Sequence, residues 1–290
     1  VMLQVWGSYR LIVKVFKWLT MSLFAYVIAA FLAKPDWYEV ARATFMPQVR
    51  FTSEYVTTLV AILGTTISPY LFFWEASEEV EEEKSEGRAR LTQRLGATDD
   101  EIRREKVDTV VGMLFCNVVF YFVILAAGAT LHVSGKTDIQ SATDAAQALR
   151  PLAGSLATVL FAIGLIGAGL LAVPVLTGSA AYAVAETFGW PSGLDEKPRH
   201  AKKFYAVIAA STLVGVAIDF LGINPIKALF WTAVINGVVA PPLLVVVMLV
   251  ANNKRVMGSR TNGPVTNIVG WLAAAVMFAA AIAMFVLWGS

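Results

Sequence analysis

The chain has 290 residues, of which 57% are hydrophobic and 15% are charged. Soluble domains carry about 25% charged residues, so this composition excludes an ordinary soluble domain and indicates an integral membrane protein. The net charge of +2 gives no indication of a nucleic-acid partner, and the single cysteine, Cys116, excludes a disulfide framework.

A spanning helix needs about 20 mostly apolar residues, and seven stretches of this chain meet that requirement. The predicted spans are, in chain order, 16–33, 55–77, 107–131, 151–188, 204–221, 225–251 and 265–288. Residues 1–15 are interpreted as the tail of an earlier helix and a basic linker, so we expect the natural beginning of the protein to precede Val1. The long fourth span is expected to bend at Pro174.

The second span, YVTTLVAILGTTISPYLFFWEAS, is interrupted at Ser68-Pro69. Proline removes a backbone donor, and lipid supplies no replacement, so such a break is tolerated only inside protein or against a water-filled cavity. Transporters use interrupted helices to turn free backbone groups toward an ion or substrate. A simple proline kink is the alternative interpretation.

The charged segment 78–106 follows the interrupted helix and is predicted to form a helix-turn-helix in water. Its acidic run, 78–83, is expected to be a solvated helix face rather than a site. Seventeen of the 23 Lys and Arg residues fall in one set of alternate loops, which lie at 10–17, 84–106, 197–203 and 254–260. The positive-inside rule places these loops in the cytoplasm, so the chain is predicted to start inside and end outside.

Catalytic signatures are absent from the sequence. His132 and His200 have no partner at metal-ligand spacing, and no HExxH, CxxC, Walker or GxSxG motif appears. The sequence therefore favours a function other than catalysis, with no cofactor.

The polar residues at membrane depth are more informative. The carbonyls before the break, including that of Thr65, lose helical partners because Pro69 has no N–H, and the hydroxyl of Ser68 lies beside them. Glu75 follows the aromatic run and is interpreted either as a pathway carboxylate or as the first acid of the solvated run. Asn236 is interpreted either as an interhelical hydrogen-bonding residue or as part of a cavity lining.

Three sequence runs carry a family resemblance. They are GTTISPYLFFWEASEEVEEE, LTGSAAYAVAETFGWP and GINPIKALFWTAVINGVVAPPL, and together they resemble the Nramp family of divalent-metal transporters. The resemblance covers essentially the whole chain but only the C-terminal part of that family. It implies an all-α, LeuT-like inverted-repeat fold, in which the seven spans correspond to family helices five to eleven and the four N-terminal helices are missing.

The same resemblance implies a partial ion site. The family's acidic Asp-Pro-Gly-Asn segment has no counterpart here, so missing N-terminal helices or a partner chain would have to supply it. The family motif Met-Pro-His reads Ser68-Pro69-Tyr70, which replaces a soft thioether by a hard oxygen and favours ions such as Mg²⁺. Tyr70 replaces one family histidine, Glu75 falls where a second lies, and Thr232 aligns with a polar pair on a later helix.

These inferences predict the C-terminal portion of a secondary transporter for divalent cations, Mg²⁺ or Mn²⁺, in a bacterial-type inner membrane. Thr65 and Ser68 are the predicted metal-binding residues. The predicted proton or ion pathway comprises Tyr70, Glu75, Thr232 and Asn236. Two alternatives stay open: a transporter of the same fold that moves an organic solute, and a truncated membrane remnant that does not transport.

Overall fold

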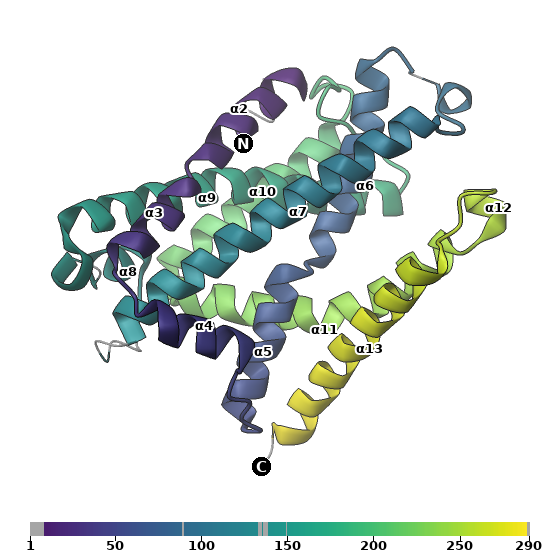
Figure 1. Ribbon diagram of the computed structural model, residues 1–290. Coiled ribbons are helices and arrows are strands. Elements are labelled where there is room, and N and C mark those ends of the chain that lie inside the picture. Colours follow the sequence, from purple (N-terminus) through teal and green to yellow (C-terminus); the bar gives the residue numbers. More distant parts are fainter. Residues whose placement is uncertain (1–8, 89, 133–134, 136–138, 149, 289–290) are drawn as a thin grey trace. The chain divides into compact units, whose positions relative to one another are not determined.

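The computed structural model describes residues 9–88, 90–132, 135, 139–148 and 150–288, and every regular element in these ranges is helical (Figure 1). The helices are, in chain order, α2 (Tyr9–Met21), α3 (Phe24–Leu32), α4 (Trp37–Phe45), α5 (Ser53–Thr66), α6 (Pro69–Ser85), η1 (Leu91–Gln93), α7 (Asp99–Ala127), η2 (Gly128–His132), α8 (Ala142–Ala148), α9 (Arg150–Thr187), α10 (Lys202–Phe220), α11 (Pro225–Ala251), α12 (Lys254–Met257) and α13 (Pro264–Leu287). The all-helical prediction is therefore confirmed for the described residues. The predicted helix tail at residues 1–8 lies outside them.

Among the residues that the structure describes, six helical segments are long and apolar enough to cross a membrane. They are Leu11–Leu32, Ser53–Ser85, Asp99–His132, Gly154–Thr187, Pro225–Ala251 and Pro264–Leu287. Each coincides with a predicted span. The seventh predicted span, 204–221, is helix α10, which is not among the six.

Two spans differ in detail from the prediction. The first consists of two helices, α2 and α3, and at their junction the Ser22 hydroxyl donates to the Leu19 carbonyl over 2.6 Å. In α9 the backbone leaves helical dihedral angles at Gly154, with φ 82° and ψ 175°, whereas Pro174 lies inside the helix. A positive φ suits glycine, so the irregular point of this helix lies before its apolar run.

The chain forms two compact units, each of which combines segments that are distant in sequence. The first unit contains the described residues of 1–47 and 73–224. Its helix α9 packs against α2, α3, α8 and α10, while α3 also packs against α7. One buried cluster joins Trp74 of α6 to Tyr182 of α9 and Phe204 of α10, and a second centres on Tyr26 and Phe161.

The second unit contains residues 48–72 and the described part of 225–290. Here α5, α11 and α13 pack against one another (Figure 1). Val56, Val60 and Ala61 of α5 form its buried core with Val234 of α11 and Met284 of α13. This core holds α5 next to α11 up to the point where α5 ends.

Candidate functional site

The predicted break in the second span is present at the predicted position. Helix α5 ends at Thr66, and its last cap bond runs from the Ile67 N–H to the Leu63 carbonyl over 2.8 Å. Helix α6 then starts at Pro69, a position where the missing N–H costs no helical bond. The Leu71 N–H bonds the Ser68 carbonyl over 3.0 Å, which closes the first turn of the new helix.

The Ser68 side chain fills the gap that Pro69 leaves in the hydrogen-bond ladder. Ser68 is only 2% exposed, and its hydroxyl bonds both the Gly64 carbonyl at 2.9 Å and the Thr65 carbonyl at 3.0 Å. The Thr65 carbonyl would normally accept the N–H of residue 69, which proline does not have. A hydroxyl keeps two acceptor lone pairs and a carbonyl has two, so both oxygens retain capacity for a cation.

The threonine hydroxyls before the break are turned back along their own helix. Thr65 Oγ1 donates to the Ala61 carbonyl at 2.9 Å, and Thr66 Oγ1 donates to the Ile62 carbonyl at 2.8 Å. Such bonds to the carbonyl four residues earlier are a common arrangement for Ser and Thr inside helices. They leave the backbone carbonyl as the group that Thr65 presents at the break, and its role as an ion ligand stays a prediction.

Helix α11 crosses α5 at a glycine pair immediately before the break. A Cβ added to Gly64 would come within 2.7 Å of the Gly237 Cα, and one added to Gly237 would come within 2.7 Å of Val60 Cγ1. Small residues of this kind allow helix backbones to approach closely in a membrane protein. Sequence reasoning missed this contact, although Gly64 and the Asn236-Gly237 pair, both inside apolar runs, were available as signals.

The two predicted pathway residues of α11 lie beside this contact. Thr232 and Asn236 are four residues apart and therefore share one face of the helix, adjacent to the face of Ala233 and Gly237 that meets α5. Thr232 is exposed and donates its hydroxyl to the Ala228 carbonyl at 2.8 Å, whereas Asn236 is half-buried. The second unit thus contains both residues together with Thr65 and Ser68.

Tyr70 and Glu75 lie on α6, beyond the break. Tyr70 is half-buried in the first turn, and Glu75 is exposed. A helix rises about 1.5 Å per residue, so the six steps from Pro69 to Glu75 correspond to roughly 9 Å along the axis. The predicted role of Glu75 on a pathway stays a prediction.

The break itself supplies neutral oxygens. In the part of the chain that the structure describes, no group of three or more His, Cys, Asp or Glu residues is placed to hold a metal ion. The sequence of the second unit contains one acidic residue, Glu54, in the first turn of α5. A complete cation site at Ser68 would therefore need an acidic ligand from elsewhere.

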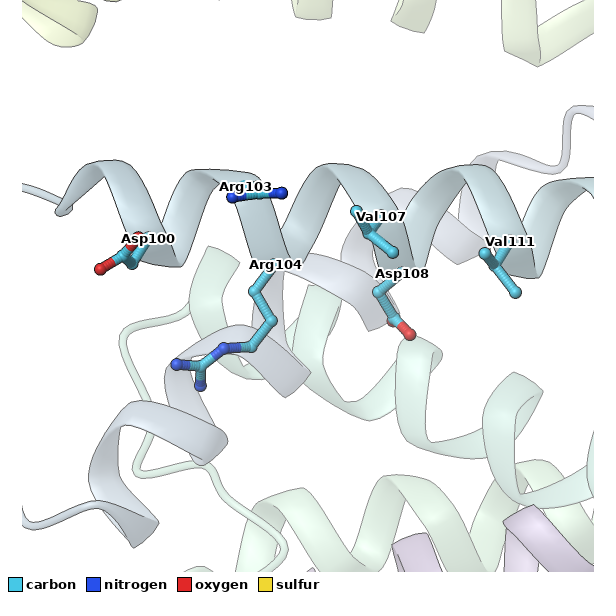
Figure 2. A pocket seen from close by; sticks show the side chains of 6 residues that line it. All are labelled: Asp100, Arg103, Arg104, Val107, Asp108 and Val111. Atoms are coloured by element: carbon cyan, nitrogen blue, oxygen red, sulfur yellow. The ribbon is translucent and has the colours of Figure 1, made fainter.

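Two hollows lie along the charged segment of the first unit. The larger, about 600 Å³, is lined by one helix alone, as Figure 2 shows: Asp100, Arg103, Arg104, Val107, Asp108 and Val111 of α7. The smaller, about 80 Å³, is lined mainly by glutamates together with Arg88 and Arg104. Alternating charges on a single helix do not form a ligand set, so the larger hollow is not a metal site on these residues. The glutamates of the smaller hollow are not among any group placed to hold a metal ion in the described part of the chain.

Arg88 neutralises much of the acidic hollow. Its guanidinium lies 2.8 Å from Glu86, 2.6 Å from Glu101 and 3.4 Å from Glu83. The hydrogen bonds to Glu86 and Glu101 raise the pKa of Arg88 above its ordinary value, so the side chain stays charged. These bonds join the end of α6 to the start of α7.

The acidic run is not uniformly solvated, so the prediction for residues 78–83 is wrong in one respect. Glu82 is exposed as expected, but Glu81 is only 2% exposed and pairs with Lys84 Nζ at 3.1 Å. Its burial depends on a loop far along the chain, which the local sequence pattern does not reveal.

The comparisons with known proteins agree with one another. The family model described as natural resistance-associated macrophage protein-like matches residues 1–287. Similar curated proteins include three named divalent metal cation transporter MntH. That of Caldanaerobacter subterraneus is 26% identical over 250 residues, that of Clostridium acetobutylicum 27% over 254, and that of Bacillus subtilis 26% over 267. The matches cover 86%, 86% and 90% of this chain but only 55%, 54% and 57% of the relatives, so the chain spans about half their length.

Proposed function

The chain belongs to the natural resistance-associated macrophage protein (Nramp) family, and from this premise we propose that it is part of a secondary transporter for divalent metal cations. It is an integral membrane protein, and the described part of the chain contains six helices long and apolar enough to span a bilayer. The similar MntH proteins are named as transporters of such cations. The LeuT-like arrangement of the helices, with the chain start in the cytoplasm, belongs to the same proposal.

The main structural evidence for the proposal is the buried hydroxyl of Ser68 at the helix break. Ser68 and the carbonyl of Thr65 place two hard oxygen donors where α5 ends, without an apolar side chain between them. Oxygen ligands suit Mg²⁺ and Mn²⁺, whereas the thioether found at this place in other family members suits softer metals. We therefore propose a preference for hard divalent ions.

The remaining ligands of the proposed cation site would come from outside the 290 residues of this sequence. Neutral oxygens alone bind a divalent cation weakly, and the second unit offers only Glu54 as an acid, at the far end of α5 from Ser68. We propose that an acidic segment supplied by further helices, or by a partner chain, completes the site. Tyr70, Glu75, Thr232 and Asn236 would then line the path of the ion or of a coupled proton.

Uptake into liposomes tests the proposal directly. The complete gene product is reconstituted, and entry of Mn²⁺ and Mg²⁺ is followed with trapped metal-sensitive dyes, in parallel with radiolabelled amino acids and amines. We expect metal entry that falls in Ser68→Ala but not in Thr66→Val, because the Thr66 hydroxyl only bonds a carbonyl one turn earlier. Entry of an organic solute with no entry of either metal would show that the same-fold alternative is correct.

A further inference from the structure

The inner half of the broken helix has one buried face. Trp74, Ser77 and Glu81 follow at spacings of three and four residues, which places them on the same side of α6. All three are buried, at 8%, 6% and 2% exposure, whereas Glu75, Glu79 and Glu82 are exposed. A carboxylate at the end of such a face is costly to bury unless it is paired and hydrogen-bonded.

Glu81 meets that requirement through the loop between α9 and α10. Its carboxylate accepts a hydrogen bond from the backbone N–H of Asp195 and pairs with Lys84 at 3.1 Å. Gly193 leaves room for it, since an added Cβ would lie 2.9 Å from Glu81 Oε1. Gly193 also has a φ of 150°, which disfavours other residues. The loop is thus shaped around the carboxylate.

The loop is in turn fixed to two helices by tyrosine hydroxyls. Tyr205 of α10 donates to the carbonyls of Glu196 at 2.9 Å and Leu194 at 3.2 Å. Tyr182 of α9 accepts the Leu194 N–H at 3.2 Å, and its ring also meets the edge of Trp74 with centroids 6.3 Å apart. Two points of α6, at Trp74 and at Glu81, are therefore attached to the same rigid pair of helices.

We propose that Glu81 is a positioning residue that fixes residues 73–85 of α6 on the α9–α10 loop and thereby holds Glu75, a residue of the predicted ion path, in place. Glu75 and Glu81 lie in one continuous helix, so an anchor at Glu81 constrains the position of Glu75. This inference rests on the proposed function, because it assigns the anchored helix to the ion path. Glu81 itself does not touch the ion.

The anchoring step can be tested without measuring transport. Ser77 lies on the buried face between Trp74 and Glu81, so a cysteine there reports whether that face stays covered. Ser77→Cys is introduced into a Cys116→Ser background, and its modification rate by a permeant maleimide is measured in the complete gene product. Glu81→Ala and Gly193→Ala should raise the rate by about tenfold or more, as expected for local opening of a packed helix.

Two further variants separate anchoring from a general loss of folding. Glu81→Gln keeps an oxygen for the Asp195 N–H and should give an intermediate rate. Glu82→Gln, on the adjacent exposed residue, should leave the rate unchanged. Every variant is first checked for monodisperse elution, and equal rates in wild type, Glu81→Gln and Gly193→Ala would overturn the proposal.

Transport kinetics then test the consequence for the ion. If Glu81 sets the position of Glu75 on the ion path, Glu81→Gln should raise the apparent KM for Mn²⁺ by roughly two- to thirtyfold, the range seen for residues that act on a site from a distance. A merely structural role of Glu81 would lower the maximal rate through loss of active protein and leave KM unchanged. An unchanged KM in Glu81→Gln would therefore also overturn the proposal. Absence of metal transport in the wild type would instead contradict the proposed function while leaving the maleimide result valid.

Discussion

The hydroxyl of Ser68 lies 3.0 Å from the carbonyl oxygen of Thr65 and donates a hydrogen bond to it. That carbonyl is the one that Pro69 leaves without its helical donor. Ser68 therefore has one structural role and one proposed role: its hydroxyl satisfies the partly buried Thr65 carbonyl, and we propose that its lone pairs offer an oxygen to an ion. The first role concerns stability and the second concerns selectivity, so different substitutions test them.

Removal of the hydroxyl should destabilise the helix break. In Ser68→Ala the partly buried Thr65 carbonyl loses its donor inside the protein, and a hydrogen bond of this kind contributes about 0.5–1.5 kcal/mol. Thermal unfolding in detergent should show this loss, and Ser68→Thr, which keeps a hydroxyl, should restore much of it. Thr66→Val is the control, because the Ile62 carbonyl that Thr66 bonds also has its regular helical donor. Equal melting temperatures for Ser68→Ala and wild type would contradict this role.

Exchange of the hydroxyl for a thioether should change ion preference. Ser68→Met replaces a hard oxygen by a soft sulfur, which favours Mn²⁺ over Mg²⁺. We expect the Mn²⁺ to Mg²⁺ uptake ratio to rise by about tenfold, the change that about 1.4 kcal/mol produces. Ile67→Met adds a thioether one residue away, without replacing the hydroxyl, and should leave the ratio near that of wild type. An unchanged ratio in Ser68→Met would remove Ser68 from the ion site.

The glycine contact between α5 and α11 should tolerate no side chain. Gly64→Ala places a methyl group against the Gly237 backbone, and Gly237→Ala places one against Val60, so the helices must separate. Overpacking of this kind costs about 1–3 kcal/mol, and backbone contacts belong at the upper end of that range. Thermal unfolding should detect the loss in either variant.

A glycine without close neighbours provides the matched control. Gly215 lies inside α10, and an added Cβ meets nothing within 4 Å. Gly215→Ala should therefore stabilise its helix by about 0.5–1 kcal/mol, because alanine has the higher helix propensity. A loss of stability of the same size at Gly215 as at Gly64 would show that the close approach of α5 and α11 is not the cause.

The features that could be predicted from sequence are those determined by local chemistry. The break was predicted because proline lacks an N–H wherever it occurs, and the span 225–251 was predicted because Asn224-Pro225 opens a long apolar run. The burial of Glu81 and the approach of Gly64 to Gly237 were not predicted, since each depends on a partner far along the chain. From sequence alone, a glutamate within an acidic run is expected to be solvated. The burial of Glu81 follows from the α9–α10 loop, which only the structure shows.

Arg88 should keep the connection between α6 and α7 in one ordered conformation. Arg88→Gln removes the shared cation from Glu83, Glu86 and Glu101, which then repel one another. Ion pairs near the surface contribute little to stability, so we expect a small change in melting temperature but faster amide hydrogen exchange in residues 86–98. Arg103→Gln, on an exposed residue of α7, should not change exchange there. Unchanged exchange in Arg88→Gln would show that the ion pairs do not order this connection.

Glu75 has two proposed roles, and ionic strength separates them. If its carboxylate only keeps the inner entrance negative, Glu75→Gln should lower uptake at low salt and have little effect at high salt, because the Debye length falls from about 30 Å at 0.01 M to about 3 Å at 1 M. If the carboxylate accepts a proton during transport, Glu75→Gln should flatten the pH dependence of uptake at both salt concentrations, since an amide cannot titrate. Uptake is therefore measured across pH at both salt concentrations.

Glu82→Gln is the control for this experiment, because Glu82 is another exposed carboxylate of the same helix that is not on the predicted path. An electrostatic role shared by the whole acidic run predicts similar losses in Glu75→Gln and Glu82→Gln, since both remove one negative charge from α6. A specific role predicts a change in Glu75→Gln alone. Uptake in Glu75→Gln that equals wild type at every pH and at both salt concentrations would remove Glu75 from the pathway and leave it as the first acid of a solvated helix face.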